Sequence, residues 1–165
     1  MATPTISTCD LCDRFRDSAS DDFRVLPGVF RSYGGRMAFH GPVRTLRCHE
    51  ANAKLRELLQ TPGDGRVIVV DGGASMQRAL LGGNLAGFAA QHGWAGVLIN
   101  GVVRDLAELR AADVGIFALG HCPMPSYKRE EGSLDEPVRI QGTWIRPGDW
   151  LYADEDGIVV SSTAL

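Results

Sequence analysis

The sequence lacks the features that would place it in a membrane or on nucleic acid. None of its apolar runs approaches the roughly 20 residues that a membrane-spanning helix needs. The N-terminus has neither the charged nor the apolar segment of a signal peptide. No run of Lys and Arg exceeds two residues and the net charge is −3, which disfavours binding to nucleic-acid phosphates. We therefore expect a cytoplasmic protein that binds neither membranes nor nucleic acid directly.

Cysteine is also scarce, with four residues that we expect to be thiols in the cytoplasm. Cys9 and Cys12 have the spacing of a redox pair or of half a zinc site. A zinc site needs a second pair of ligands, and Cys48 and Cys122 are isolated in the sequence. The same spacing fits one face of a helix, so we interpret the pair as two small buried side chains. The four histidines show no metal-ligand spacing to one another.

What remains is typical of one globular domain covering residues 1–165, with 44% hydrophobic and 22% charged residues. Helix-like and strand-like segments alternate in the middle of the chain, and both ends are rich in strands, which predicts an α/β fold. The predicted helices cover residues 5–15, 52–60, 84–92 and 106–112. The predicted strands cover residues 23–26, 42–48, 66–71, 95–103, 114–119, 138–141, 143–145, 150–153 and 157–161. Residues 76–81 are compatible with a strand or a helical turn, and residues 121–137 are irregular.

The segment from Gly82 to Asp105 carries the strongest functional signal. A glycine loop that opens a helix, here Gly82-Gly83-Asn84-Leu85, presents unpaired backbone N–H groups to an anion. The next strand delivers Arg104 and Asp105 at its carboxyl end, where open α/β sheets bind ligands. Arg offers a planar fork to a carboxylate or keto oxygen, and Asp offers oxygens to Mg²⁺ or Mn²⁺. Together they predict a small site for an anionic keto acid.

A structural interpretation of the same residues is also open. Arg104 and Asp105 fit an ordinary surface pair in which Asp105 caps the following helix, and Gly82-Gly83 fits a tight turn. We expect Trp94 to pack rather than bind, and Asp71 to serve the turn at Gly72-Gly73.

Several motifs share their order and spacing with one family over nearly the whole chain. They lie at residues 33–39, 65–73, 78–80, 93–96, 101–105, 147–149 and 152–159. On these residues the chain resembles the regulator of ribonuclease E activity A proteins, also called the 4-hydroxy-4-methyl-2-oxoglutarate aldolase-like family. The resemblance implies a swivelling β/β/α domain that assembles as a homotrimer with sites between subunits.

For the site, the resemblance implies one role for each matching residue. The amides of Gly82, Gly83, Asn84 and Leu85 bind the substrate, Arg104 contacts the keto acid, and Asp105 holds the divalent metal largely through waters. The aldolases also carry an acidic residue twenty-one positions before the arginine, which is Gly83 in this chain. Since carboxylates near a metal are worth about 10–100-fold in affinity or activity, this departure predicts weak activity.

Two functions follow from these observations. The first is a lyase dependent on Mg²⁺ or Mn²⁺ that cleaves 4-hydroxy-4-methyl-2-oxoglutarate and decarboxylates oxaloacetate through a pyruvate enolate. No lysine follows a strand where a Schiff-base aldolase would need one. The second is a non-catalytic trimer that inhibits an endoribonuclease partner by protein contact. The retained Asp105 favours the lyase, and Gly83 favours the inhibitor. A methyltransferase is disfavoured, because the glycine loop lacks the pattern of an adenosyl-cofactor site.

Overall fold

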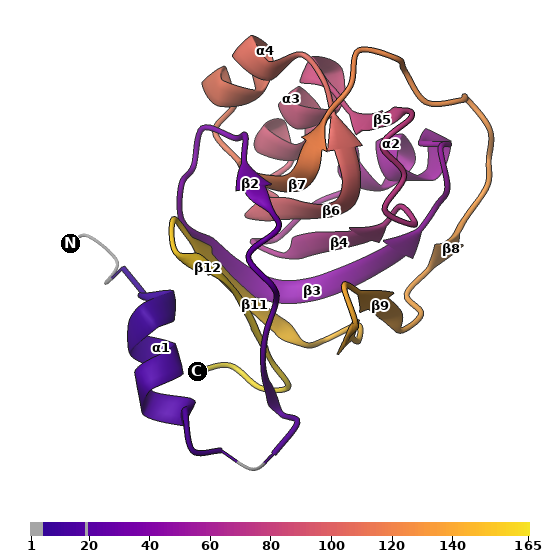
Figure 1. Cartoon of the computed structure of the whole chain (residues 1–165). Helices are drawn as coiled ribbons and strands as arrows, with labels where there is room; N and C mark the ends of the chain where they lie inside the picture. The colour runs from indigo at the N-terminus through magenta and orange to yellow at the C-terminus, as the bar shows by residue number, and fades with distance from the viewer. Residues whose placement is uncertain (1–4, 19) are drawn as a thin grey trace.

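The computed structural model describes residues 5–18 and 20–165 and shows a mixed α/β fold (Figure 1). The helices are α1 (Thr8–Phe15), α2 (Ala53–Leu59), α3 (Gly83–Gln91) and α4 (Leu106–Ala111). The strands are β1 (Phe23–Val25), β2 (Arg31–Ser32), β3 (Phe39–Arg47), β4 (Val67–Asp71), β5 (Ala79–Leu81), β6 (Gly96–Val103), β7 (Gly115–His121), β8 (Ser133–Leu134), β9 (Val138–Ile140), β10 (Thr143–Ile145), β11 (Trp150–Asp154) and β12 (Gly157–Ser161). None of the helices among these residues is long and apolar enough to cross a membrane.

One ten-stranded sheet organises the molecule, with a main path in the order β1-β12-β11-β3-β4-β6-β7-β2. Strands β3, β4, β6 and β7 run parallel, and the outer strands join them antiparallel. Helices α2, α3 and α4 cover one face of the parallel strands (Figure 1). The opposite face packs against side chains from β9, β10, β11 and β12. Strands β4 and β6 are thus apolar along their length because both of their faces are covered.

The predicted elements are largely confirmed, and the differences have local causes. The predicted strand at 42–48 begins earlier, at Phe39. Leu46 near its end is buried as well as Val43 and Thr45, because Leu46 packs into the core beneath the helices. Arg47, the last residue of this strand, is exposed. Residues 76–81 hold a strand only at Ala79–Leu81. The predicted helix at 84–92 begins one residue earlier, at Gly83, and the irregular segment 121–137 contains β8.

Strand β5 determines where the site forms. Strand β4 accompanies β6 only as far as the pair Asp71 and Asn100, and β5 then lies beside the last residues of β6. Leu81 at the end of β5 is in register with Val103 at the end of β6, and the two strands are parallel. The chain segments that follow these residues therefore emerge side by side at the carboxyl edge of the sheet.

Helix α1 packs on the outer strands, remote from that edge (Figure 1). Ser7 caps the helix by accepting a hydrogen bond from the Asp10 amide. Leu11 is buried against Tyr152 and Val159. The expectation of two buried cysteines here is wrong: Cys9 is exposed, because the buried face of α1 is centred on Leu11.

The Asp154 carboxylate on β11 forms hydrogen bonds with the first residue of α1. The amide and the hydroxyl of the buried Thr8 donate to the Asp154 carboxylate at 2.8 and 2.6 Å. Burial alone would raise the pKa of Asp154, but the hydrogen bonds from Thr8 and from the amides of Asp156 and Gly157 outweigh it and hold the pKa below its usual range. The carboxylate form thus stabilises the docked helix.

Thr8→Val is therefore expected to lower the free energy of unfolding by about 2 kcal/mol at pH 7, because a hydroxyl bond to a charged group is lost. The folded-state pKa of Asp154 is depressed, so its contribution is present above the unfolded pKa and is lost as pH falls through the folded value. Urea unfolding at pH 7 and pH 3 measures this, and the difference between Thr8→Val and the wild type should shrink at pH 3. A difference of equal size at both pH values would contradict the role of the charged carboxylate.

Candidate functional site

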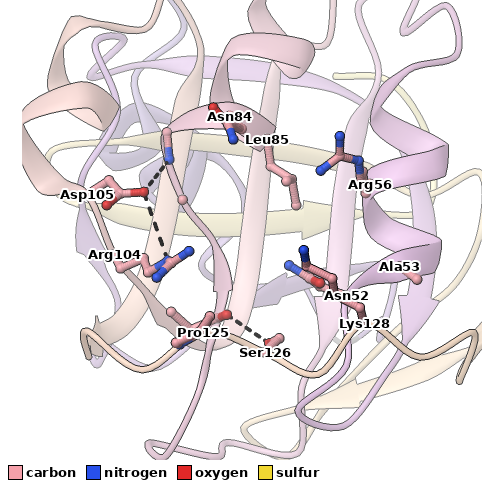
Figure 2. A pocket seen from close by; sticks show the side chains of 13 residues that line it. Asn52, Ala53, Arg56, Asn84, Leu85, Arg104, Asp105, Pro125, Ser126 and Lys128 are labelled. Carbon is pink, nitrogen blue, oxygen red and sulfur yellow. Dashed lines mark hydrogen bonds and ion pairs between the residues drawn. The ribbon is translucent and has the colours of Figure 1, made fainter.

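A pocket of about 420 Å³ opens where β5 and β6 end. In Figure 2, Arg104 and Asp105 form one wall, Arg56 of α2 and Lys128 form the opposite wall, and Leu85 projects between them. The Gly82-Gly83 loop closes one side of the pocket. The structure thus brings together all six site residues that the sequence predicted, from two segments about 20 residues apart.

Asp105 is held in an unusual backbone conformation. Its φ and ψ are 59° and 49°, a left-handed conformation that Asp and Asn tolerate better than other non-glycine residues. In this geometry its side chain makes no capping bond to α4 and instead accepts a hydrogen bond from the Gly83 amide at 2.9 Å through Oδ2. The interpretation of Asp105 as an ordinary helix cap is therefore wrong. Its carboxylate faces the pocket and the glycine loop.

Arg104 lies beside this carboxylate. Its backbone amide donates to the Leu81 carbonyl at 3.0 Å, which ties the end of β6 to the end of β5. The Nε atom is 4.0 Å from Asp105 Oδ2, and Nη1 donates to the Pro123 carbonyl at 3.4 Å. Both charged side chains remain 40% exposed, so each has donor or acceptor capacity left for a ligand.

The start of α3 has the geometry of an anion site. The first backbone bond of the helix is donated by the Ala86 amide to the Gly82 carbonyl at 3.0 Å, so the amides of Gly83, Asn84 and Leu85 precede the helical ladder. A Cβ atom at Gly82 would lie 2.5 Å from Asp105 Oδ2. Glycine is thus required for close approach to the carboxylate, and not only for a tight turn.

Sequence reasoning missed Glu108, in the first turn of α4. A Cβ atom at Gly83 would lie 1.5 Å from Glu108 Oε2 and 2.6 Å from Glu108 Cδ. The Glu108 carboxylate therefore occupies the space that a side chain at position 83 would fill. The available signal was spacing, because Glu108 follows Asp105 by three residues and such positions share a helix face.

Arg56 and Lys128 are a second pair of pocket residues that the sequence did not reveal. Lys128 lies on the irregular segment, which is anchored just before it by Ser126 and Tyr127. The Ser126 hydroxyl donates to the Ala79 carbonyl, and the Tyr127 amide donates to the Glu50 carbonyl, both at 2.8 Å. With Arg104, these residues give the pocket lining three cations against one carboxylate, Asp105. The pocket therefore favours a ligand that carries negative charge.

The donor set suits a weakly coordinated hard cation. Within residues 5–18 and 20–165, no three His, Cys, Asp or Glu side chains gather as a metal cage. Mg²⁺ does not need one, because it keeps several waters and binds proteins through one or two carboxylates together with its substrate. Asp105 meets this requirement, since one of its oxygens is fixed by Gly83 and its carboxylate lines the pocket. The residues present thus fit Mg²⁺ or Mn²⁺ at Asp105.

The residues expected to be structural are confirmed as such. Trp94 is buried and its indole donates to the Thr61 carbonyl at 3.1 Å. Asp71 accepts the Gly73 amide at 2.9 Å, which is the predicted turn contact. Burial and then the nearby Asp71 charge raise the pKa of Cys48 to about 12, so this thiol is not a nucleophile.

Comparison with known proteins gives a consistent assignment. A family model described as RraA-like, Aldolase/RraA, matches residues 8–160. A protein of Albidiferax ferrireducens named as a 4-hydroxy-4-methyl-2-oxoglutarate aldolase is 52% identical over 99% of both chains, and one of Alkalilimnicola ehrlichii with the same name is 51% identical over 98% of both.

Solved structures agree with this fold. The RNA-processing inhibitor RraA from Thermus thermophilis is 44% identical, with a TM-score of 0.91 over 97% of this chain and 94% of that one. A Geobacillus kaustophilus protein described as an S-adenosylmethionine:2-dimethylmenaquinone methyltransferase is 42% identical, with the same TM-score over 97% of each chain. The sequence relatives and the solved structures together bear three functional names, so function has to be argued from the site.

Proposed function

Because this chain belongs to the RraA-like family, we propose that it is a divalent-metal-dependent lyase that cleaves 4-hydroxy-4-methyl-2-oxoglutarate and decarboxylates oxaloacetate. The observation that carries the proposal is the Asp105 carboxylate, held by the Gly83 amide in a pocket with Arg104 and the start of α3. The aldolase name borne by relatives about 50% identical supports the same reaction class.

Both reactions leave an electron pair on the carbon next to a keto group. The residues act where this charge spreads onto the keto oxygen. Asp105 would hold Mg²⁺ or Mn²⁺, which when bound supplies a Lewis acid for the keto and carboxylate oxygens. Arg104 donates charge-assisted hydrogen bonds to the same oxygens, and its contact with Pro123 limits the directions in which the guanidinium can point.

The glycine loop and Glu108 complete the proposed arrangement. The amides of Asn84 and Leu85 bind the substrate carboxylate at the positive end of α3. Glu108 supplies a second carboxylate beside Gly83, and this carboxylate would accept hydrogen bonds from water held by the metal. The expectation of weak activity rested on the missing acid at position 83, and we propose that Glu108 supplies this acid instead.

The first test is metal removal. The purified protein with Mg²⁺ or Mn²⁺ is expected to decarboxylate oxaloacetate and to release pyruvate from 4-hydroxy-4-methyl-2-oxoglutarate. EDTA should reduce both rates to those without enzyme, and added Mg²⁺ should restore them, because the charge on the keto oxygen is otherwise unbalanced. Pyruvate release coupled to lactate dehydrogenase measures both reactions. A rate no higher than that of the free metal ion would contradict the proposal.

A second candidate is the inhibition of an endoribonuclease by protein contact, which the likeness to the Thermus RNA-processing inhibitor favours. In either case we propose a homotrimer, and sedimentation velocity tests this directly. A protein without metal-dependent turnover that binds a ribonuclease E-type enzyme in a pull-down would support the inhibitor over the lyase.

A further inference from the structure

Arg56, a cationic side chain, lies on the pocket wall opposite Arg104 and Asp105 and has no role in the reaction proposed above. Arg56 extends from α2 toward the open space of the pocket (Figure 2). Its guanidinium lies 5.4 Å from the centre of the Phe88 ring. Within the described residues, no Asp or Glu oxygen comes within the 4.0 Å of an ion pair with it. The guanidinium fork therefore remains available to a ligand.

The pocket has a positively charged side chain at each end, Arg104 and Arg56, and an apolar side chain between them. Leu85 is only 6% exposed and projects between the Arg104 wall and the Arg56 wall (Figure 2). Its side chain would face the carbon skeleton of a ligand rather than an ionic group. A volume of about 420 Å³ is at the lower end of ligand pockets, which hold molecules larger than a three-carbon keto acid. The pocket is thus built for a ligand with an anionic group at each end and apolar carbon between them.

Resting on the proposed function, we propose that Arg56 determines specificity by binding the carboxylate that an aldol substrate keeps on its carbonyl fragment. In cleavage of 4-hydroxy-4-methyl-2-oxoglutarate, the C3–C4 bond breaks and its electron pair stays on C3. The C4 hydroxyl gives up its proton as C4 becomes a ketone, and C3 then takes up a proton. The distal carboxylate keeps its charge throughout, so Arg56 can bind it equally in substrate and product.

Decarboxylation places the opposite demand on the same wall. The carboxylate of oxaloacetate that leaves as CO₂ loses its charge during the reaction, so a cation that binds it stabilises the ground state more than the transition state. Arg56, which has no protein carboxylate as partner, therefore favours aldol cleavage, in which the distal carboxylate is kept, over decarboxylation, in which it is lost. The arrangement selects diacid aldol substrates over counterparts that lack the distal carboxylate.

The test compares two substrates that differ only at the distal group. One is 4-hydroxy-4-methyl-2-oxoglutarate, and the other is 4-hydroxy-4-methyl-2-oxopentanoate, in which a methyl group replaces the distal carboxylate. Arg56→Gln should lower kcat/KM for the diacid by about 10–100-fold, the effect of one charged hydrogen-bonded pair. It should leave kcat/KM for 4-hydroxy-4-methyl-2-oxopentanoate, the monoacid, within about twofold. Arg110→Gln, the same change at an exposed position of α4, should alter neither.

Both compounds are also measured as inhibitors of oxaloacetate decarboxylation, so the ratio of their affinities is obtained even where the monoacid is cleaved slowly. If Arg56→Gln lowered kcat/KM equally for both compounds, or for neither, the proposed role of Arg56 would be overturned. Absence of all metal-dependent turnover in the wild-type protein would instead overturn the proposed function. The two failures are thereby distinguished.

Discussion

Asp105→Asn is expected to lower kcat/KM for oxaloacetate between about 100-fold and 1,000-fold, the range found when one preorganised electrostatic group of an active site is removed. The same variant should bind Mn²⁺ at least about tenfold more weakly, which calorimetry measures without any substrate. Asn is chosen because its side-chain oxygen can still accept the Gly83 amide hydrogen bond. Asn also tolerates the left-handed backbone at this position.

The physical reason for so large an effect is charge. Asp105 is the only carboxylate among the residues that line the pocket, beside Arg56, Arg104 and Lys128. Its neutral replacement leaves three cations and no carboxylate in the pocket lining, and these cations repel a divalent metal. The substrate carboxylate would still be attracted, so KM should change less than kcat. A fall confined to KM would indicate that Asp105 serves only to position Arg104.

Asp64 offers a matched control for this substitution. It has the same residue type in the same left-handed conformation, with φ of 53°, and its side chain is 78% exposed. Asp64→Asn therefore repeats the chemical and the backbone change outside the pocket. It should retain activity and Mn²⁺ affinity within about twofold. If both variants lost activity to the same extent, the loss would reflect backbone strain rather than chemistry at the site.

The sequence was sufficient to predict the parts of the fold that depend on continuous apolar patterns. Strands β4 and β6 were predicted within a residue or two, because strands covered on both faces are rich in apolar residues, with only Asn100 polar inside β6. Strands β2 and β8 were missed, since each is two residues long and is defined only by its pairing with β7 or β3. Such short strands depend on tertiary contacts that no local pattern records.

The candidate site divides in the same way. Arg104, Asp105 and the glycine loop were found because they directly follow recognisable strands, whose parallel ends meet at one edge of the sheet. Arg56 lies on a neighbouring helix, and its sequence position indicates only an exposed face. The direction of the Asp105 side chain depends on a left-handed φ that sequence does not specify. Spacing along the chain therefore could not predict which side chains from different helices and strands meet in the pocket.

Glu108→Ala, followed by Gly83→Asp in the same protein, is expected to remove and then restore activity. Glu108→Ala alone should lower kcat/KM for oxaloacetate about 10–100-fold, because a carboxylate that orders water at the metal position is lost. Adding Gly83→Asp should recover at least about tenfold of that loss. The family resemblance implies an acid of the aldolases at the position of Gly83, and the Glu108 carboxylate fills the space beside Gly83.

The single variant Gly83→Asp tests whether the side chains at positions 83 and 108 occupy the same space or act independently. In wild-type background, Gly83→Asp places a Cβ atom 1.5 Å from Glu108 Oε2 and 3.0 Å from Glu108 Cβ, so the Glu108 carboxylate must move away. Two carboxylates at one place also repel each other, so this variant should be no more active than the wild type. The two substitutions should therefore be strongly non-additive in a double-mutant cycle.

Additive effects would mean that the two positions act separately and that Glu108 does not stand in for the acid of the aldolases. Loss of activity through unfolding is separated by thermal unfolding of each variant, since Glu108 is exposed and its truncation should cost little stability. The restored variant should again require a divalent metal and be inhibited by EDTA. Metal-dependent recovery would locate one acidic function at this place in the fold, supplied from α4 in this chain and from α3 in the aldolases it resembles.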